Sequence, residues 1–163
     1  MPNVSSNAAA DGGGVNGGAV VWLHGDHLSA TNPALAAYPN APVVFVFDEP
    51  FLREANLSFH RIQFLYESVM DVFAARPAGT CTLLRGAVPA EVRDFARSHG
   101  APLVATTQTV GARFAEYKKT LEGDGLRVRA YPVRELVTYP DVERVPKRFS
   151  AWWREVEGEA LRP

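Results

Sequence analysis

The sequence has little cysteine and no long apolar run. Cys81 is the only cysteine among 163 residues, which excludes a disulfide within the chain and is typical of a reducing compartment. No apolar run approaches the roughly 20 residues that a membrane-spanning helix needs. The N-terminus also lacks the basic start and Leu-rich centre of a signal peptide. We therefore expect a cytoplasmic protein without a membrane segment.

An excess of charge of one sign is also missing. The chain has 17 Lys and Arg against 18 Asp and Glu, a formal net charge of −1, so we expect no direct contact with nucleic acid. Two phosphate-binding motifs are absent as well. No G-x-G-x-x-G follows the first apolar run, and no G-x-x-x-x-G-K-[ST] occurs. These absences disfavour a GxGxxG dinucleotide enzyme and a P-loop enzyme.

Catalytic nucleophiles and metal ligands lack their usual settings. There is no G-x-S-x-G motif, and we expect Cys81 to be buried in the middle of a strand. The segment HGDH, residues 24–27, offers two imidazoles and a carboxylate. A zinc site needs a further ligand, and neither His60 nor His99 lies in a matching pattern. We predict no catalytic residue and no metal site, and expect Asp26 to accept hydrogen bonds from the backbone of its own loop.

The chain does contain a regular alternation of apolar runs and amphipathic segments. The apolar runs are predicted as strands, and the segments between them as helices. This order indicates parallel strands joined by right-handed crossovers. We therefore predict an α/β, Rossmann-like, doubly wound sheet of five parallel strands in the order 3-2-1-4-5. The predicted strands are 19–24, 41–49, 80–86, 101–108 and 126–133, and the predicted helices are 58–77, 89–100, 111–125 and 146–160.

The two ends of the chain differ from its centre. Residues 1–18 are mostly Gly, Ala, Asn and Ser and are predicted to be a disordered tail. Residues 19–137 form the predicted α/β domain, and residues 138–163 a linker and C-terminal helix. Trp152 and Trp153 lie about 100° apart around that helix, so one face cannot hold both. We expect the helix to fold back on its own domain, with a homodimer or a separate protein partner covering what remains apolar.

Five segments, in order, resemble the N-terminal α/β domain of the photolyase and cryptochrome family. VWLHGDHLSATNPAL is similar to the family's opening, V-W-F-R-x-D-L-R-x-x-D-N-P-A-L, and VFVFDEPFL to its second strand, which ends in F-D-P. RIQFLYESVMDV resembles R-x-x-F-L-x-E-S-L-x-D-L, and LLRGAVPAEVRDFARSHGA resembles L-x-x-x-x-G-x-P-x-x-x-L. The tail VPKRFSAWWREVEGEALRP is similar to the linker of DASH-type cryptochromes. The resemblance covers residues 19–163.

The resemblance implies a stand-alone antenna-type domain, which binds a small molecule or docks on a separate partner. A folate or a deazaflavin is the antenna that it implies. The family's FAD-binding helical domain would begin after the linker, so we expect no FAD and no enzymatic activity from this chain. Two alternatives stay open. One is a remnant interaction domain without a ligand; the other is a nucleotide-binding protein of the universal-stress type, whose G-x-x-G-x(9)-G-[ST] motif is absent.

Two positions depart from the family pattern. His24 stands where members usually carry Arg, and Gln108 stands roughly where many carry an acidic residue that helps to hold a folate. An amide cannot pair ionically with a pterin. Ligands of doubly wound sheets bind beyond the carboxyl ends of the strands, where the strand order reverses. This rule, together with the resemblance, gives the candidate ligand-binding residues Asp26, Asp48, Glu49, Phe51 and Gln108.

Overall fold

The structure is a computed structural model that describes residues 18–133, 137 and 145–161. Almost all of the predicted disordered tail, and residues 138–144 of the predicted linker, lie outside the described residues. The chain divides into two compact units, one ending at Tyr131 and the other beginning at Pro132. Within the described ranges, no helix has the length and apolar character needed to cross a membrane.

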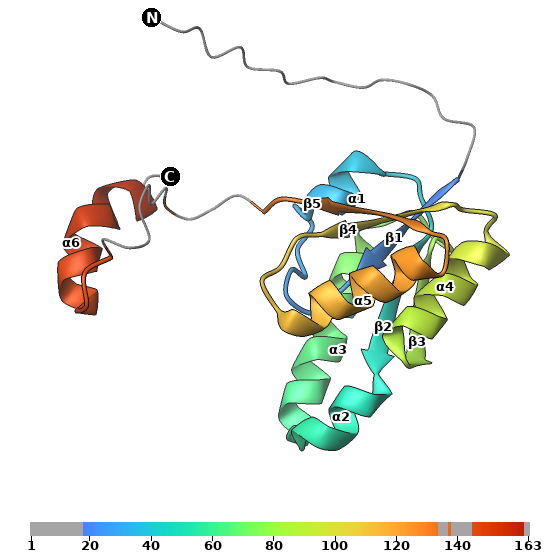
Figure 1. Cartoon of the computed structure of the whole chain (residues 1–163), viewed down its shortest axis with the longest axis horizontal. Helices are drawn as coiled ribbons and strands as arrows, with labels where there is room; N and C mark the ends of the chain where they lie inside the picture. The colour runs from blue at the N-terminus through green and yellow to red at the C-terminus, as the bar shows by residue number, and fades with distance from the viewer. Residues whose placement is uncertain (1–17, 134–136, 138–144, 162–163) are drawn as a thin grey trace, which may run out of the picture. The chain divides into compact units, whose positions relative to one another are not determined.

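Five parallel strands form one sheet in the order β3-β2-β1-β4-β5 (Figure 1). This confirms the predicted order and pairing. The central strand β1 pairs Val21 with Val43 of β2 and Ala19 with Leu103 of β4. Both faces of β1 and β2 are covered, which explains their uninterrupted apolar runs. The strands are β1 (Ala19–Leu23), β2 (Val43–Asp48), β3 (Cys81–Gly86), β4 (Leu103–Thr107) and β5 (Arg127–Tyr131).

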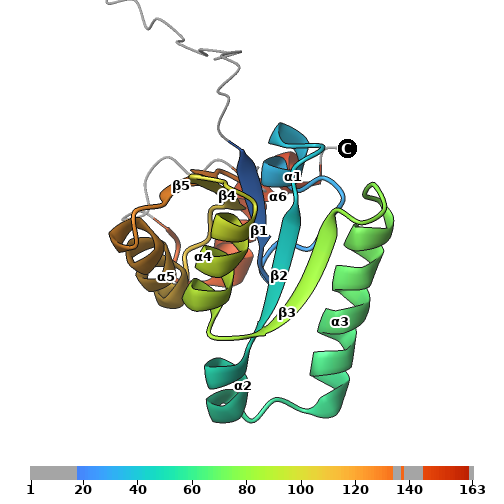
Figure 2. The ribbon, with the colours of Figure 1, turned by 90° about the vertical axis from the view of Figure 1, so that its right-hand side faces the viewer.

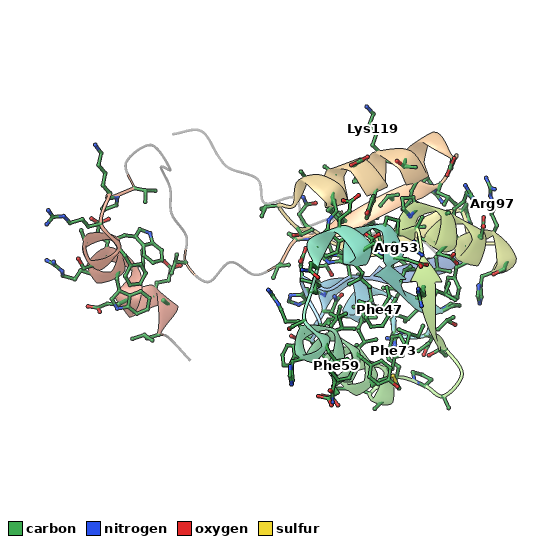
Figure 3. All side chains as sticks on the ribbon, turned by 90° about the horizontal axis from the view of Figure 1, so that it is seen from below. Phe47, Arg53, Phe59, Phe73, Arg97 and Lys119 are labelled. Carbon is green, nitrogen blue, oxygen red and sulfur yellow. The ribbon has the colours of Figure 1, made fainter. Side chains whose placement is uncertain are left out.

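Helices cover both faces of the sheet (Figures 1 and 2). Successive side chains of a strand point to opposite faces, so Val21 and Leu23 pack with α1 and α3, while Val20 and Trp22 pack with α4 and α5. Charged side chains such as Lys119 of α5 project away from the sheet (Figure 3). The helices of this layer arrangement are α1 (Pro33–Ala37), α3 (Phe59–Ala74), α4 (Val88–Ser98) and α5 (Ala112–Gly123).

Two local features differ from the sequence predictions. Between the predicted strand 41–49 and the predicted helix 58–77, the structure contains the helix α2 (Glu49–Ala55), which was not predicted. Asp48 caps it by accepting a hydrogen bond from the Phe51 amide, and Asn56 ends it in the left-handed conformation. Cys81, expected in mid-strand, is the first residue of β3 and is half-buried, because the strand begins one position later than predicted.

The second unit contains the helix α6 (Phe149–Ala160). The Phe149 ring lies 5.6 Å from the ring of Trp152 and 5.9 Å from the ring of Trp153, measured between centroids. The two indoles, expected on separate faces, therefore share one aromatic cluster. The reason is that Phe149 precedes them by three and four positions, which places it next to both on the helix surface.

Candidate functional site

A cavity of about 930 Å³ lies beyond the carboxyl ends of β1 and β2. Residues from the start of α3 and from the start of α5 line it. Its volume falls within the range of small-molecule sites, and it occupies the edge of the sheet where such folds bind ligands. Most of its wall is aromatic or aliphatic, with Trp22, Phe45, Val46, Phe47, Phe51, Leu52, Leu57, Phe64, Leu65, Val88, Ala112 and Phe114 among the lining residues.

A stacked aromatic pair forms part of this wall. The rings of Trp22 and Phe114 lie 5.7 Å apart with an interplanar angle of 17°, and both side chains are buried. Tyr117 approaches Trp22 from the next turn of α5, at 6.5 Å between centroids. The pair joins α5 to the central strand, and the small part of it that stays exposed belongs to the apolar wall of the cavity.

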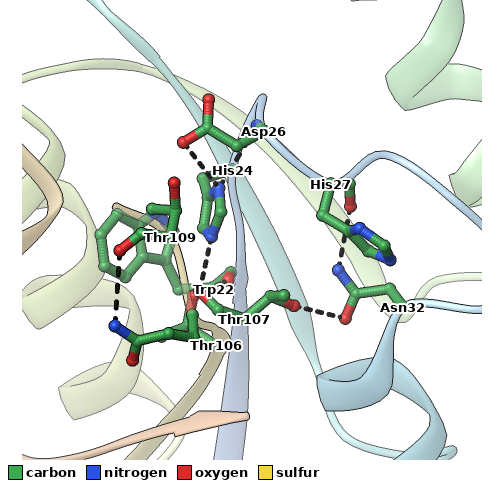
Figure 4. Close-up of polar contacts among 9 residues, drawn as sticks. Trp22, His24, Asp26, His27, Asn32, Thr106, Thr107 and Thr109 are labelled. Atoms are coloured by element: carbon green, nitrogen blue, oxygen red, sulfur yellow. Dashed lines mark hydrogen bonds and ion pairs between the residues drawn. The ribbon is translucent and has the colours of Figure 1, made fainter. Parts of the chain in front are cut away.

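His24 extends the wall at the end of β1 (Figure 4). Its Nε2 lies 2.8 Å from the carbonyl oxygen of Thr107, and its Nδ1 accepts a hydrogen bond from the Asp26 amide at 3.3 Å. A carbonyl oxygen can only accept, so the proton lies on Nε2 and the ring is neutral. Burial lowers the pKa of His24 below its ordinary value of 6.5, because burial disfavours the charged form. His24 therefore links β1 to the end of β4 as a neutral side chain.

Asn32 organises the loop that follows β1. Its buried amide donates to the His27 carbonyl at 2.9 Å and accepts from the Ala34 amide and from the Thr107 hydroxyl, both at 2.9 Å (Figure 4). The prediction that the Asp26 carboxylate accepts hydrogen bonds from the backbone of this loop was wrong. The Asp26 side chain is 66% exposed, and its carboxylate lies 3.8 Å from His24 Nδ1. Asn32 can hold the loop because an amide both donates and accepts, whereas a carboxylate only accepts.

Asp48 forms a polar corner of the cavity with two residues of α5. Its Oδ2 accepts a hydrogen bond from the Tyr117 hydroxyl at 2.5 Å and lies 3.9 Å from Nη1 of Arg113. Burial, followed by the hydrogen bond to Asp48, raises the pKa of Tyr117 to about 12. The Arg113 guanidinium lies 3.4 Å above the centre of the Phe51 ring. These contacts connect β2, α2 and α5 around one carboxylate.

The structure brings three of the five predicted site residues to the cavity. Asp26, Asp48 and Phe51 line it. Glu49 lies at a separate surface position and accepts hydrogen bonds from Arg53 and Arg85, each at 2.7 Å. Arg85 first, then Arg53, lowers the pKa of Glu49.

Gln108, the fifth predicted residue, is exposed and is not among the residues that line the cavity. Its side-chain amide donates to the neighbouring Thr109 carbonyl at 3.4 Å. Thr109, one position further along the chain, does line the cavity. The carboxyl end of β4 therefore reaches the site through the next residue.

Sequence reasoning missed the contribution of α5. Arg113 and Tyr117 lie one helical turn apart and face the same side, and Phe114 stands between them in the sequence. This i, i+4 pair just after a predicted strand was a usable signal. Trp22 lies in an apolar run, and the sequence of such a run does not distinguish a residue that lines a cavity from a residue of the core.

The HGDH segment does not assemble a metal site in the part of the chain that the structure describes. No group of three or more His, Cys, Asp or Glu side chains there is placed to hold a metal ion. His24 turns toward the Thr107 carbonyl, and Asn32 holds the backbone of His27. The segment acts as the first structural turn after β1.

Comparison with known proteins supports the fold. No protein-family model matches the sequence, and no curated protein sequence does either. Among solved structures, a bacterial class III photolyase from Agrobacterium tumefaciens is similar over 92% of this chain, with a TM-score of 0.60 and 19% identity. A cryptochrome from Synechocystis sp. PCC6803 is similar over 91%, with a TM-score of 0.68 and 15% identity. The expected resemblance to photolyases and cryptochromes is confirmed at the level of the fold.

The likeness covers only part of those proteins. The chain spans 34% of the photolyase and 35% of the cryptochrome, about a third of each. A third structure, hypothetical protein MJ0577, is similar over 74% of this chain at 11% identity, but its TM-score of 0.46 is too low to support an argument.

Proposed function

We propose that the α/β unit binds a small planar heterocycle, a folate or a deazaflavin, in the cavity beyond β1 and β2. In this role the unit is an antenna-type binding domain and carries out no catalysis. The observation that carries the proposal is the stacked wall of Trp22 and Phe114 at the ligand-binding edge of a photolyase-like fold. A flat ring gains dispersion and apolar burial against such a wall.

The polar groups of the cavity suit a heterocycle that carries N–H donors. Asp48 is an acceptor at the cavity wall, and its two oxygens have lone pairs beyond those used by Phe51 and Tyr117. A ring N–H that donates to Asp48 forms a charge-assisted hydrogen bond. Gln108 lies outside the cavity, so we assign the acidic ring contact to Asp48.

The test is a titration with 5-formyltetrahydrofolate and, separately, with 5-deazariboflavin. Binding is followed by the quenching of tryptophan fluorescence and by the near-UV absorption that stays with the protein after gel filtration. Ala112→Trp narrows the cavity at an exposed helix start, so the fold is kept while the cavity is filled. Ala115→Trp is the matched control, because Ala115 is exposed on the same helix and does not line the cavity.

We expect at least one of the two compounds to bind the natural chain and the Ala115→Trp variant, with at least tenfold weaker binding to Ala112→Trp. Ten-fold corresponds to about 1.4 kcal/mol, less than the loss expected when a bulky side chain blocks an apolar site. Absence of binding by both compounds contradicts the proposal, and so does equal binding by the two Trp variants.

A second proposal is docking on a separate protein, or on a second copy of the chain, through the C-terminal Trp segment. The Phe149 side chain, which contacts both indoles, is 71% exposed. Exposed aromatic side chains of this kind are typical anchors of protein interfaces. Sedimentation of the full chain at low micromolar concentration tests it.

A further inference from the structure

Two arginines from different helices stand at the same cavity. Arg61 is in the first turn of α3, and Arg113 is in the first turn of α5. Within the described part of the chain, the Arg61 side chain is exposed and makes no ion pair. The Arg113 side chain is 50% exposed, and its nearest carboxylate oxygen, on Asp48, is 3.9 Å away. Most guanidinium donors of both residues are therefore available to a ligand.

The positions of these arginines do not serve their own helices. A cation in the first turn meets the positive end of the helix dipole, which disfavours it. Neither α3 nor α5 has an acidic residue in its first turn or a side-chain hydrogen bond at its N-cap. By contrast, α2 and α4 each carry a glutamate in the first turn. Helix stability alone would therefore favour a neutral or acidic residue over an arginine at positions 61 and 113.

Two carboxylates, Asp26 and Asp48, line the cavity with the two arginines, and only Arg113 lies within ion-pair distance of one of them, Asp48. Asp48 already accepts hydrogen bonds from Tyr117 and from the Phe51 amide. Asp26 is exposed beside His24. Most of the remaining cavity wall is apolar, so burying a ligand with several charged groups there is unfavourable. The arrangement suits a molecule with an apolar body and one anionic end.

We infer that the ligand of this cavity is an amphipathic aromatic anion, and that Arg61 and Arg113 bind its carboxylate, sulfonate or phosphate group. The inference rests on the proposed function, since it needs a cavity that takes a ligand. Beyond the proposed function, it specifies that the ligand is negatively charged and that these two arginines bind the charged group. The aromatic body lies against Trp22 and Phe114, and the anion lies at the rim.

Two fluorescent probes that differ in charge separate the inference from the proposed function. 8-Anilinonaphthalene-1-sulfonate is an aromatic anion, and N-phenyl-1-naphthylamine has the same aromatic rings without the sulfonate. Both are titrated against the full chain, against Arg61→Gln and against Arg113→Gln. Lys119→Gln is the matched control, because it removes one positive charge from an exposed position on α5 that points away from the body (Figure 3). Circular dichroism verifies that each variant is folded.

We expect Arg61→Gln and Arg113→Gln each to weaken binding of the sulfonate about fivefold, within the range of a half-exposed ion pair. The neutral probe should bind all four proteins alike, and Lys119→Gln should bind the sulfonate as the natural chain does. Because Arg113 also packs on Phe51, Arg113→Lys is included. It keeps the charge and should bind the sulfonate more tightly than Arg113→Gln does.

The outcomes are distinguishable. If the neutral probe binds but the arginine variants leave the sulfonate affinity unchanged, the charge inference is wrong and the cavity proposal stands. If both probes weaken equally in the variants, the arginines act through packing and the inference is again wrong. If neither probe binds the natural chain, the cavity takes no aromatic ligand, and the inference and the proposed function fall together.

Discussion

His24 is the residue whose chemistry depends most on its surroundings. It is held between β1 and β4 as a neutral ring, with its proton directed to the Thr107 carbonyl. An arginine, which members of the resembled family usually carry here, could not be neutral at this position. A histidine at this position makes the end of β1 sensitive to pH, which an arginine would not do.

We predict that acidification destabilises the fold through His24. The unfolded ring titrates near 6.5, and the folded ring takes up its proton only at a lower pH. Between these two values the unfolded chain binds more protons, so the free energy of unfolding falls as the pH drops below about 6.5. The free energy of unfolding stops falling through this group once the pH is below the pKa of His24 in the folded chain. Urea unfolding from about pH 8 to pH 5 measures it.

The control for this prediction is His24→Gln, which removes the titrating group and keeps a side-chain donor. The natural chain should be more stable than the variant at high pH, and the difference should narrow as the pH falls. A constant difference for His24→Gln over the whole range would show that His24 contributes nothing to the pH dependence.

At the scale of elements, α5 is held to the sheet by Phe114. The ring is 8% exposed, stacks on Trp22, and also lies 5.6 Å from the His24 ring. We predict that Phe114→Ala lowers the free energy of unfolding by about 3–5 kcal/mol, the range for a large buried aromatic side chain. Phe59→Ala, at a side chain that is 72% exposed, should change it by less than about 1 kcal/mol. Urea midpoints compare the two, and equal shifts would contradict the assignment of Phe114 to the core.

The sheet was predictable from the sequence, because runs such as VVFVFD occur only in strands covered on both faces. The helix α2 was not. EPFLREA has seven residues, too few for a periodic pattern, and Asp48 was interpreted as a ligand contact before its capping role was visible. Phe51, Asp26 and Asp48 line the cavity at the strand ends, and their contact with a ligand stays a prediction.

The rest of the site could not be predicted because it depends on long-range packing. Trp22 and Phe114 meet only when α5 crosses the sheet beside β1, and no local pattern encodes that distance. Asn32 illustrates the same limit. Asn32 and Pro33 begin α1, a local feature, but the hydrogen bond from the Thr107 hydroxyl to Asn32 joins residues 75 positions apart.

At the scale of the whole molecule, the two units differ in how much core they contain. The α/β unit has apolar clusters on both faces of its sheet. The second unit has a helix of 12 residues, a length at which an isolated helix is marginal in water. We still expect segment 146–160 to bury its indoles, either by folding back on the chain or by association.

We predict that both indoles of the full chain are protected from solvent. A chain ending at residue 133 keeps only Trp22, so the difference in acrylamide quenching between the two chains reports on Trp152 and Trp153. Sedimentation at low micromolar concentration then identifies the cause: a monomer indicates folding back, and a dimer that becomes monomeric on truncation indicates association. A monomer with both indoles fully quenched would contradict both expectations. The shortened chain should still unfold cooperatively.

The position of β1 in the sheet has a consequence for synthesis. It leaves the ribosome before the other four strands of the described sheet, yet one of its two neighbours is β4, and the hydroxyl of Thr106 that bonds to the Trp22 carbonyl lies 84 positions later. At about 5–20 residues per second, translation needs roughly 4–17 s to supply that partner. During this interval one edge of the central strand is unpaired and the indole of Trp22 lacks its cover. The nascent chain therefore exposes backbone and apolar side-chain surface that the folded protein covers.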